Sequence, residues 1–340
     1  MTEHTTVGID LAKSVFYVVV LGAHGQVAQR KKLRRNQVLR FVSQLPAQSV
    51  IAMEACSSAH HWGREIQALG YTARLLPPQH VKGYLRGQKN DYNDALAIAE
   101  TCRHGAVRAV VIKSAEQQDA QAVIRIRQQL SGQRTALINQ VRGLLAERGI
   151  IVSQGVGAFR RRVPELLAQE SVLSPRFKAL LTRQYEQFLW LDRELGWYTE
   201  QLKQQAKADE TCRRLQTLPG MGPIVSTVVQ GWMGDGQQFR RGRDAAAALG
   251  LVPRQHSTGG KSRLLGITKR GDSYVRSQVV HGARAVVKHA AGKDDSLSRW
   301  INRLVARRGH NKAVVALANK LVRMAWVIVT RNENYCPQPV

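Results

Sequence analysis

The stretch Thr6-Val-Gly-Ile-Asp-Leu-Ala-Lys-Ser-Val-Phe-Tyr-Val-Val-Val-Leu21 decides the fold class of this chain. It holds two apolar runs, each too short for a typical helix, on either side of a polar turn. The pattern predicts β-strands at residues 6–10 and 15–21, the first of which ends on Asp10. The stretch therefore predicts a carboxylate at the edge of a sheet, where the active sites of layered α/β folds lie.

Similar short runs continue to about residue 110 and are separated by glycine, proline and basic turns. They predict further strands and, between them, helices, which together make an α/β layered domain over residues 1–112. The strands are expected at 27–33, 50–53 and 73–75, and the helices at roughly 36–45, 60–69 and 91–104.

Four acidic residues of this region are candidate metal ligands. Asp10 and Glu54 each end an apolar run, and Asp91 and Asp94 are three residues apart, on one side of a predicted helix. Carboxylate oxygens are the ligands that Mg²⁺ prefers, and two such ions about 4 Å apart stabilise both oxygens of a phosphoryl displacement. Taken singly each acid is also a common cap, and Asp91 alone is better explained as one. The order of the four resembles the ribonuclease-H-like fold and its Holliday-junction resolvase (RuvC-like) branch.

Charge indicates a polyanionic partner. The chain has 51 Lys and Arg against 24 Asp and Glu among 340 residues, a net charge of +27, which favours nucleic acid. A basic ribosome-associated or membrane-surface protein is the alternative on charge alone. No apolar run is long enough to span a membrane and no secretory segment opens the chain, so no membrane partner is expected. Four scattered cysteines, without a Cys-x-x-Cys pair, are typical of a reducing cytoplasm and argue against structural zinc.

Residues 113–208 are predicted to form a helical arm. Long polar helical stretches cover residues 116–148 and 175–208, with one narrow apolar seam. Such a seam fits an antiparallel or dimerising coiled coil, and it also fits an ordinary helix packed on its own domain. The seam residues identified in the first helix are Ile124, Leu130, Leu137, Val141 and Leu144.

Residues 209–330 are predicted to form a mainly α C-terminal domain, followed by a tail at 331–340. Near its start, Gly220 and Gly222 stand in a turn like that of a helix-hairpin-helix element, where backbone N–H groups approach a phosphate. A plain helix N-terminus with Pro223 in its first turn is the alternative.

The densest motif of the chain is predicted to be a flexible loop around Ser257-Thr-Gly-Gly-Lys261. Ser257 is either a phosphate-binding hydroxyl or a covalent nucleophile on the DNA backbone, and the residues alone favour the first role. His256, like the pair His60-His61, is not interpreted as a general base or metal ligand. The cations expected to contact nucleic acid there are Arg254, Lys261, Arg263, Lys269, Arg270 and Arg276.

Together these motifs resemble the DEDD transposases of bacterial insertion sequences. The closest resemblance is to the insertion sequence 110 family and its 1111-like subgroup, and it covers nearly the whole chain. The motifs that carry it are Gly8-Ile-Asp10-Leu-Ala-Lys13, Met53-Glu54 to Trp62, Lys89-Asn-Asp91-Tyr-Asn-Asp94, and the block from Ser257 to Gly271-Asp272.

The resemblance implies a cytoplasmic, nucleoid-associated recombinase that joins a circular element to target DNA. By position, Asp10, Glu54, Asp91 and Asp94 would bind Mg²⁺, two ions in all, and Ser257 would form a phosphoserine–DNA intermediate. Where many relatives carry two serines, this chain has Ser257-Thr258, so either hydroxyl is a candidate nucleophile. The resemblance also implies a composite site between protomers of a dimer or tetramer, and a noncoding bridge RNA that pairs with donor and target DNA.

Two other functions compete with this interpretation. A junction-type nuclease would use the acids alone, with water as the nucleophile. A nonenzymatic scaffold would bind nucleic acid through its charge and hairpin without cleaving it.

Overall fold

The computed structural model describes residues 5–88, 90–105, 107–169 and 173–337. The chain separates into two compact units, residues 1–118 and 119–340.

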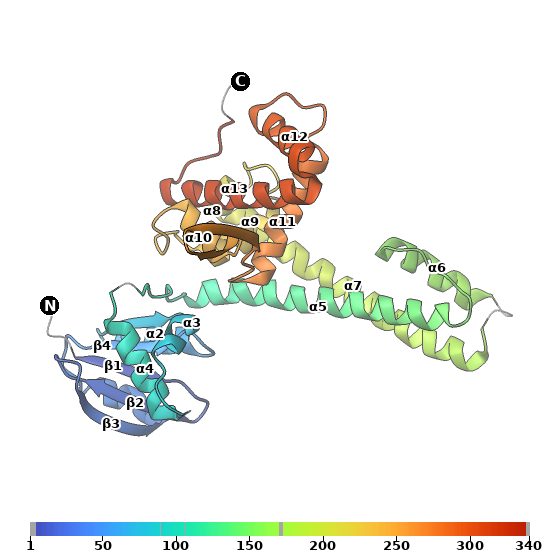
Figure 1. Ribbon diagram of the computed structural model, residues 1–340. Coiled ribbons are helices and arrows are strands. Elements are labelled where there is room, and N and C mark those ends of the chain that lie inside the picture. The colour runs from blue at the N-terminus through green and yellow to red at the C-terminus, as the bar shows by residue number, and fades with distance from the viewer. Residues whose placement is uncertain (1–4, 89, 106, 170–172, 338–340) are drawn as a thin grey trace. The chain divides into compact units, whose positions relative to one another are not determined.

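The first unit is built on a five-stranded mixed sheet in the order β3-β2-β1-β4-β5 (Figure 1). β1, β2 and β3 pair antiparallel, whereas β4 and β5 continue the sheet parallel to β1. All five predicted strands are present, and no bound differs by more than one residue from the prediction. Their bounds are β1 Thr6–Asp10, β2 Val15–Leu21, β3 Val27–Arg34, β4 Val50–Glu54 and β5 Thr72–Leu76.

Helices cover both faces of this sheet. α1 (Val38–Val42) and α2 (Ala59–Ala68) pack on the face that buries Ile9 and Phe16, and α4 (Asp91–Arg103) packs on the other. The helix predicted at 36–45 is shorter, because a 3₁₀ turn precedes α1 and Pro46 follows it closely. A short helix that the sequence did not predict, α3 (Pro78–Val81), follows β5.

Three helices of the arm share one apolar core. They are α5 (Ala115–Ala146), α6 (Val156–Ala168) and α7 (Pro175–Ala208), of which α6 was not predicted (Figure 1). One predicted seam residue of α5 is wrong: Leu144 is 43% exposed, while its neighbour Leu145 is fully buried. Another, Ile124, is buried in the core of the C-terminal helices rather than that of the arm.

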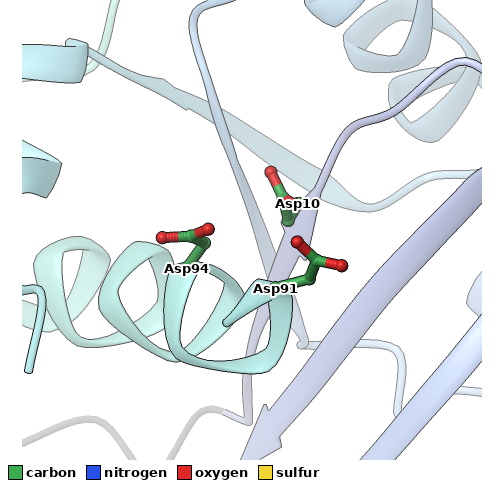
Figure 2. Close-up of side chains that lie close together, drawn as sticks. All are labelled: Asp10, Asp91 and Asp94. Atoms are coloured by element: carbon green, nitrogen blue, oxygen red, sulfur yellow. The ribbon is translucent and has the colours of Figure 1, made fainter. Parts of the chain in front are cut away.

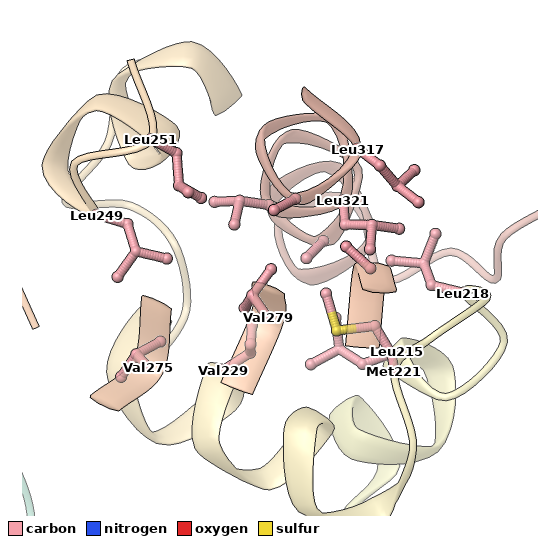
Figure 3. Packing of buried hydrophobic residues seen from close by; sticks show 14 of the residues in the cluster. Leu215, Leu218, Met221, Val229, Leu249, Leu251, Val275, Val279, Leu317 and Leu321 are labelled. Atoms are coloured by element: carbon pink, nitrogen blue, oxygen red, sulfur yellow. The ribbon is translucent and has the colours of Figure 1, made fainter. Parts of the chain in front are cut away.

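The C-terminal helices pack around α13, and Figure 3 shows part of their core. α13 is long and apolar enough to cross a membrane by composition, but about half of its most apolar window is buried within this core. The helices are α8 (Glu210–Leu215), α9 (Pro223–Met233), α10 (Gly242–Ala248), α11 (Ser273–Lys288), α12 (Ser296–Arg308) and α13 (His310–Arg331).

The segment predicted to be a flexible loop is instead a β-hairpin. β6 (Pro253–Thr258) pairs antiparallel with β7 (Lys261–Ile267), and Gly259 and Gly260 make the two-residue turn with φ of 53° and 75°. Positive φ at both turn positions is what a tight hairpin turn of type I′ requires. The residues of β6 and β7 are exposed, apart from a half-buried Ile267.

Candidate active site

Two of the four acids lie at the same edge of the sheet. Asp10 is the last residue of β1 and Glu54 is the last residue of β4. The two strands are parallel and in register, with Ile9 opposite Met53, so the two acids leave the sheet side by side. This is the edge at which layered α/β folds place their ligands.

α4 supplies the other two acids. Asn90 caps the helix, because its side-chain oxygen accepts a hydrogen bond from the Tyr92 N–H, 2.9 Å away. Asp91 and Asp94 follow in the first turn. The helix lies directly on β1 at Gly8, where an added Cβ would be only 2.1 Å from the carbonyl oxygen of Ala95. A glycine inside a strand thus permits the close approach that brings both acids to Asp10.

Asp10, Asp91 and Asp94 form an acidic triad (Figure 2). One carboxylate oxygen from each lies within 4.8 Å of the others, a spacing at which one cation can contact all three. Glu54 lies outside this triad, although its charge still acts on Asp10. The structure therefore brings three of the four predicted acids together.

The electrostatics of the triad favour a bound cation. Burial and then the charges of Asp94, Asp91 and Glu54 raise the pKa of Asp10 from 3.8 to about 6. Burial and the charge of Asp94 also raise the pKa of Glu54, an effect that nearby Lys82 partly offsets. Carboxylates that lie close together repel one another when ionised, and a hard divalent cation between them would supply the positive charge that offsets this repulsion.

The hairpin separates the hydroxyl groups of Ser257 and Thr258. Successive side chains of a strand point to opposite faces, so Ser257 shares a face with Gln255 and its cross-strand partner Ser262. The other face, which we call the basic face, carries His256, Thr258, Lys261 and Arg263. His256 therefore points away from Ser257. The side chain of Gln255 donates a 2.7 Å hydrogen bond to the Ser257 hydroxyl oxygen.

The remaining predicted cations lie at the base of the hairpin or in the bulge next to it. Arg254 falls where the register shifts, and Lys269 and Arg270 follow β7. The guanidinium of Arg276 donates to the carbonyl oxygens of Arg270 and Leu249, so it holds the base of the hairpin together.

The turn between α8 and α9 packs inside the C-terminal unit. Gly220 has φ of 81°, and an added Cβ would lie 2.7 Å from the carbonyl oxygen of Gly282 in α11. Gly222 is exposed and is the N-cap of α9, with Pro223 in the first turn. Gly220 is thus explained by close packing, whereas Gly222 is accessible.

The sequence analysis assigned no role to Gly8, Lys82 or Gln255. Gly8 was the detectable one, because a lone glycine in an apolar strand marks a close backbone approach. The sheet order and the acidic edge make the first unit a mixed α/β domain consistent with ribonuclease-H-like DEDD enzymes, which process nucleic acid.

Comparisons with known proteins give the family. Residues 7–149 match a family described as "Transposase", the DEDD transposases of the IS110 type. Residues 212–297 match the "Transposase IS116/IS110/IS902 family".

Three relatives match over nearly their whole length. The transposase for insertion sequence element IS1111A of Coxiella burnetii is 44% identical, covering 98% of this chain and 92% of the relative. A probable family 20 transposase of Pseudomonas aeruginosa is 45% identical, covering 97% and 98%. The transposase for insertion sequence element IS1328 of Yersinia enterocolitica is 37% identical, also covering 97% and 98%. The chain belongs to the IS110 family of insertion-sequence transposases, which are DNA-binding and DNA-processing enzymes.

Proposed function

We propose that this transposase cleaves and exchanges DNA strands with Ser257 as nucleophile and with Mg²⁺ at Asp10, Asp91, Asp94 and Glu54. The observation that carries the metal part is the acidic triad, whose oxygens lie within 4.8 Å of one another and repel until a cation joins them. Two ions at such a site would polarise the scissile phosphate and stabilise the leaving oxygen. Asp10 and Glu54 would offer ligand oxygens from the ends of β1 and β4, and Asp91 and Asp94 would offer them from the first turn of α4.

In the proposed step, a bond forms between the Ser257 Oγ and phosphorus while the bond from phosphorus to the 3′ oxygen breaks. The seryl proton is lost and the 3′ oxygen gains a proton, which leaves a free 3′ hydroxyl and a phosphoserine linkage. The Gln255 side chain donates to Oγ, so the seryl hydrogen stays available to a base. Exchange follows when the 3′ hydroxyl of another strand attacks the phosphoserine.

The choice of Ser257 over Thr258 rests on the two faces of the hairpin. Thr258 lies on the basic face with Lys261 and Arg263, where a hydroxyl is suited to binding phosphate. Ser257 lies on the other face, with its oxygen already oriented by Gln255. We therefore assign phosphate binding to Thr258 and attack to Ser257.

The proposed function also includes a guide RNA and self-association of the protein. A bridge RNA would supply sequence choice through base pairing, and the chain's charge of +27 suits binding both RNA and DNA backbones. Large apolar side chains exposed along α7 support self-association through the arm as a dimer or tetramer. They include Leu180, Leu189, Trp190 and Trp197, which are 44% to 57% exposed. The protein would act in the cytoplasm, at the nucleoid.

The test compares Ser257→Ala with Thr258→Ala on supercoiled DNA that carries the element ends, with Mg²⁺. After denaturation, wild type and Thr258→Ala should retain DNA covalently attached to protein, and Ser257→Ala should not. Asp10→Asn should lose recombination while it still binds DNA. An adduct that persists in Ser257→Ala and disappears in Thr258→Ala would reverse the assignment.

The acidic triad would by itself also suit a hydrolytic nuclease. That function predicts cutting by Ser257→Ala at the wild-type rate and no covalent adduct in any variant. Either result would replace the serine mechanism with water attack at the acids.

A further inference from the structure

A large groove lies beside α13 in the C-terminal unit, and none of the residues proposed for catalysis lines it. Its volume is about 1310 Å³, which exceeds the roughly 300–1,000 Å³ of pockets for small ligands. Residues of α10, α12 and α13 line it, together with residues 333–336 after α13. A groove of this size suits a segment of a polymer.

Cations dominate the charge of the groove. Arg241, Arg243, Lys320 and Arg323 line it, against the single lining carboxylate of Glu333. Among the described residues, only Arg241 of these four cations is ion-paired, with Asp244 at 3.4 Å. The groove therefore offers uncompensated positive charge to an anionic chain.

Aromatic rings accompany these cations. Trp300, Trp326 and Tyr335 all line the groove and are half-buried. The ammonium of Lys320 lies 4.9 Å from the ring centre of Trp300, so these two side chains place a charge and an aromatic surface next to each other. The Trp326 N–H donates to the carbonyl oxygen of Gly236 at 3.0 Å, which fixes that ring in place.

The walls of the groove are formed by closely packed helices. α10 and α12 both pack against α13 (Figure 1). An added Cβ at Gly242 would lie 2.8 Å from the carbonyl oxygen of Arg323, so a glycine lets the segment bearing Arg241 and Arg243 reach α13. The lining segment after α13 is also held in place, because the Tyr335 N–H donates a 2.8 Å hydrogen bond to the Thr217 hydroxyl.

We propose that this groove binds single-stranded nucleic acid, with phosphates at its cations and a base stacked on Trp300 or Tyr335. Alternating phosphates and flat bases match interleaved cations and rings, which is how single strands are bound without sequence preference. A duplex keeps its base faces stacked inside, so it would not use the rings. An acidic peptide would use the cations and leave the rings unused.

The groove is connected to the catalytic hairpin through α13. Asn319, which also lines the groove, donates a 3.2 Å hydrogen bond to the carbonyl oxygen of Leu251, two residues before β6. A strand held in the groove is thus bound by the same helix that supports the base of the hairpin. The inference deepens the proposed function by naming where an unpaired strand is held, and it does not depend on which hydroxyl attacks.

The test measures binding of fluorescent oligonucleotides by anisotropy at fixed salt, with full-length protein. The double variant Lys320→Ala/Arg323→Ala is compared with Lys312→Ala/Arg331→Ala, which removes the same charges from exposed positions of α13 outside the groove. We expect at least a tenfold loss of single-strand affinity in the groove variant relative to its control, and equal effects of the two variants on duplex affinity. The salt slope should fall by about 0.7 for each phosphate that the groove variant no longer neutralises.

Aromatic variants test the stacking part. Trp300→Leu should lose about tenfold in single-strand affinity and Trp300→Phe should recover most of it, with unchanged melting by circular dichroism confirming the fold of both. If Trp300→Leu fails to fold, photocrosslinking of 5-iodouridine oligonucleotides to wild type replaces it, with adducts expected on Trp300 or Tyr335. Equal losses in both double variants, full displacement by poly-glutamate, or adducts only outside the groove would overturn the proposal.

Two further arms identify the strand. Matched RNA and DNA oligonucleotides show whether the 2′ hydroxyl contributes, and so whether the occupant is an RNA loop or an unwound DNA strand. Ser257→Ala serves as the catalytic control. A covalent adduct that persists in Ser257→Ala, with groove binding intact, refutes only the serine mechanism. An adduct that is lost in Ser257→Ala, with no effect of the groove variants on single-strand binding, refutes only the groove.

Discussion

Asp10→Asn should stabilise the metal-free first unit at neutral pH. The pKa of Asp10 is about 6 in the folded state against an ordinary value of 3.8 in the unfolded chain. Ionisation of Asp10 at neutral pH therefore costs the folded state free energy that it does not cost the unfolded chain. Such a difference corresponds to about 3 kcal/mol at most, and solvent screening of this partly exposed group reduces it to roughly 1–2 kcal/mol. Because the folded pKa is raised, this destabilisation is absent below pH 3.8, grows as pH rises, and is complete above about pH 6.

Hydrogen exchange of β1 and α4 in EDTA measures the effect on the first unit by itself. At pH 7.5, exchange through opening of this unit should be about 5–30-fold slower in Asp10→Asn than in wild type, and the ratio should shrink toward one at pH 4.5. Comparison at equal pH cancels the intrinsic exchange rates. Saturating Mg²⁺ should slow exchange in wild type and have little effect on the variant.

Glu65→Gln is the matched control, since it neutralises a 43% exposed carboxylate on α2 outside the acidic triad. It should leave exchange in β1 and α4 unchanged at both pH values. Equal protection of wild type and Asp10→Asn at pH 7.5 would show that ionising Asp10 costs the folded unit no stability through burial or through its acidic neighbours, and the electrostatic argument for a cation would fail with it.

Three other variants and reactions test the fold around these sites. Gly8→Val should abolish Mg²⁺ binding by calorimetry, because its side chain would displace α4 from β1; a normal isotherm would contradict this. Leu145→Ala should cost about 2–5 kcal/mol in denaturant unfolding and Leu144→Ala less than about 0.5, and equal costs would contradict the burial of Leu145. Burial and then Asp209 raise the pKa of Cys212 to about 12, so native protein should be alkylated at exposed Cys336 at pH 8.5 while Cys212 reacts only after unfolding.

The first unit was largely predictable because its strands are short, apolar and separated by polar turns. That pattern set the bounds of β1 and β2 without error and placed Asp10 and Glu54 at strand ends. What the pattern could not supply is distance. The triad forms where α4 packs on β1 at Gly8, between elements more than 80 residues apart in the chain, and the sequence pattern does not show that Glu54 falls outside it.

The errors elsewhere have local physical causes. The seam of α5 was predicted with three-to-four- and seven-residue steps and a last step from Val141 to Leu144, but burial continues by four residues from Val141 to Leu145. A straight helix drifts away from a heptad pattern in this way. The hairpin was missed because neither β6 nor β7 has a buried face, so no apolar alternation marks them, and only the two adjacent glycines signal the turn.

The exposed hairpin has a consequence for when the enzyme can act. A two-stranded hairpin without a core beneath it is only marginally stable by itself, so we expect β6 and β7 to become rigid when they contact bound nucleic acid or another protomer. If Ser257 is the nucleophile as proposed, an isolated molecule would hold its hydroxyl in poor alignment, and contact with bound nucleic acid or a second protomer would fix it. Such a dependence would confine strand cleavage to the assembled complex.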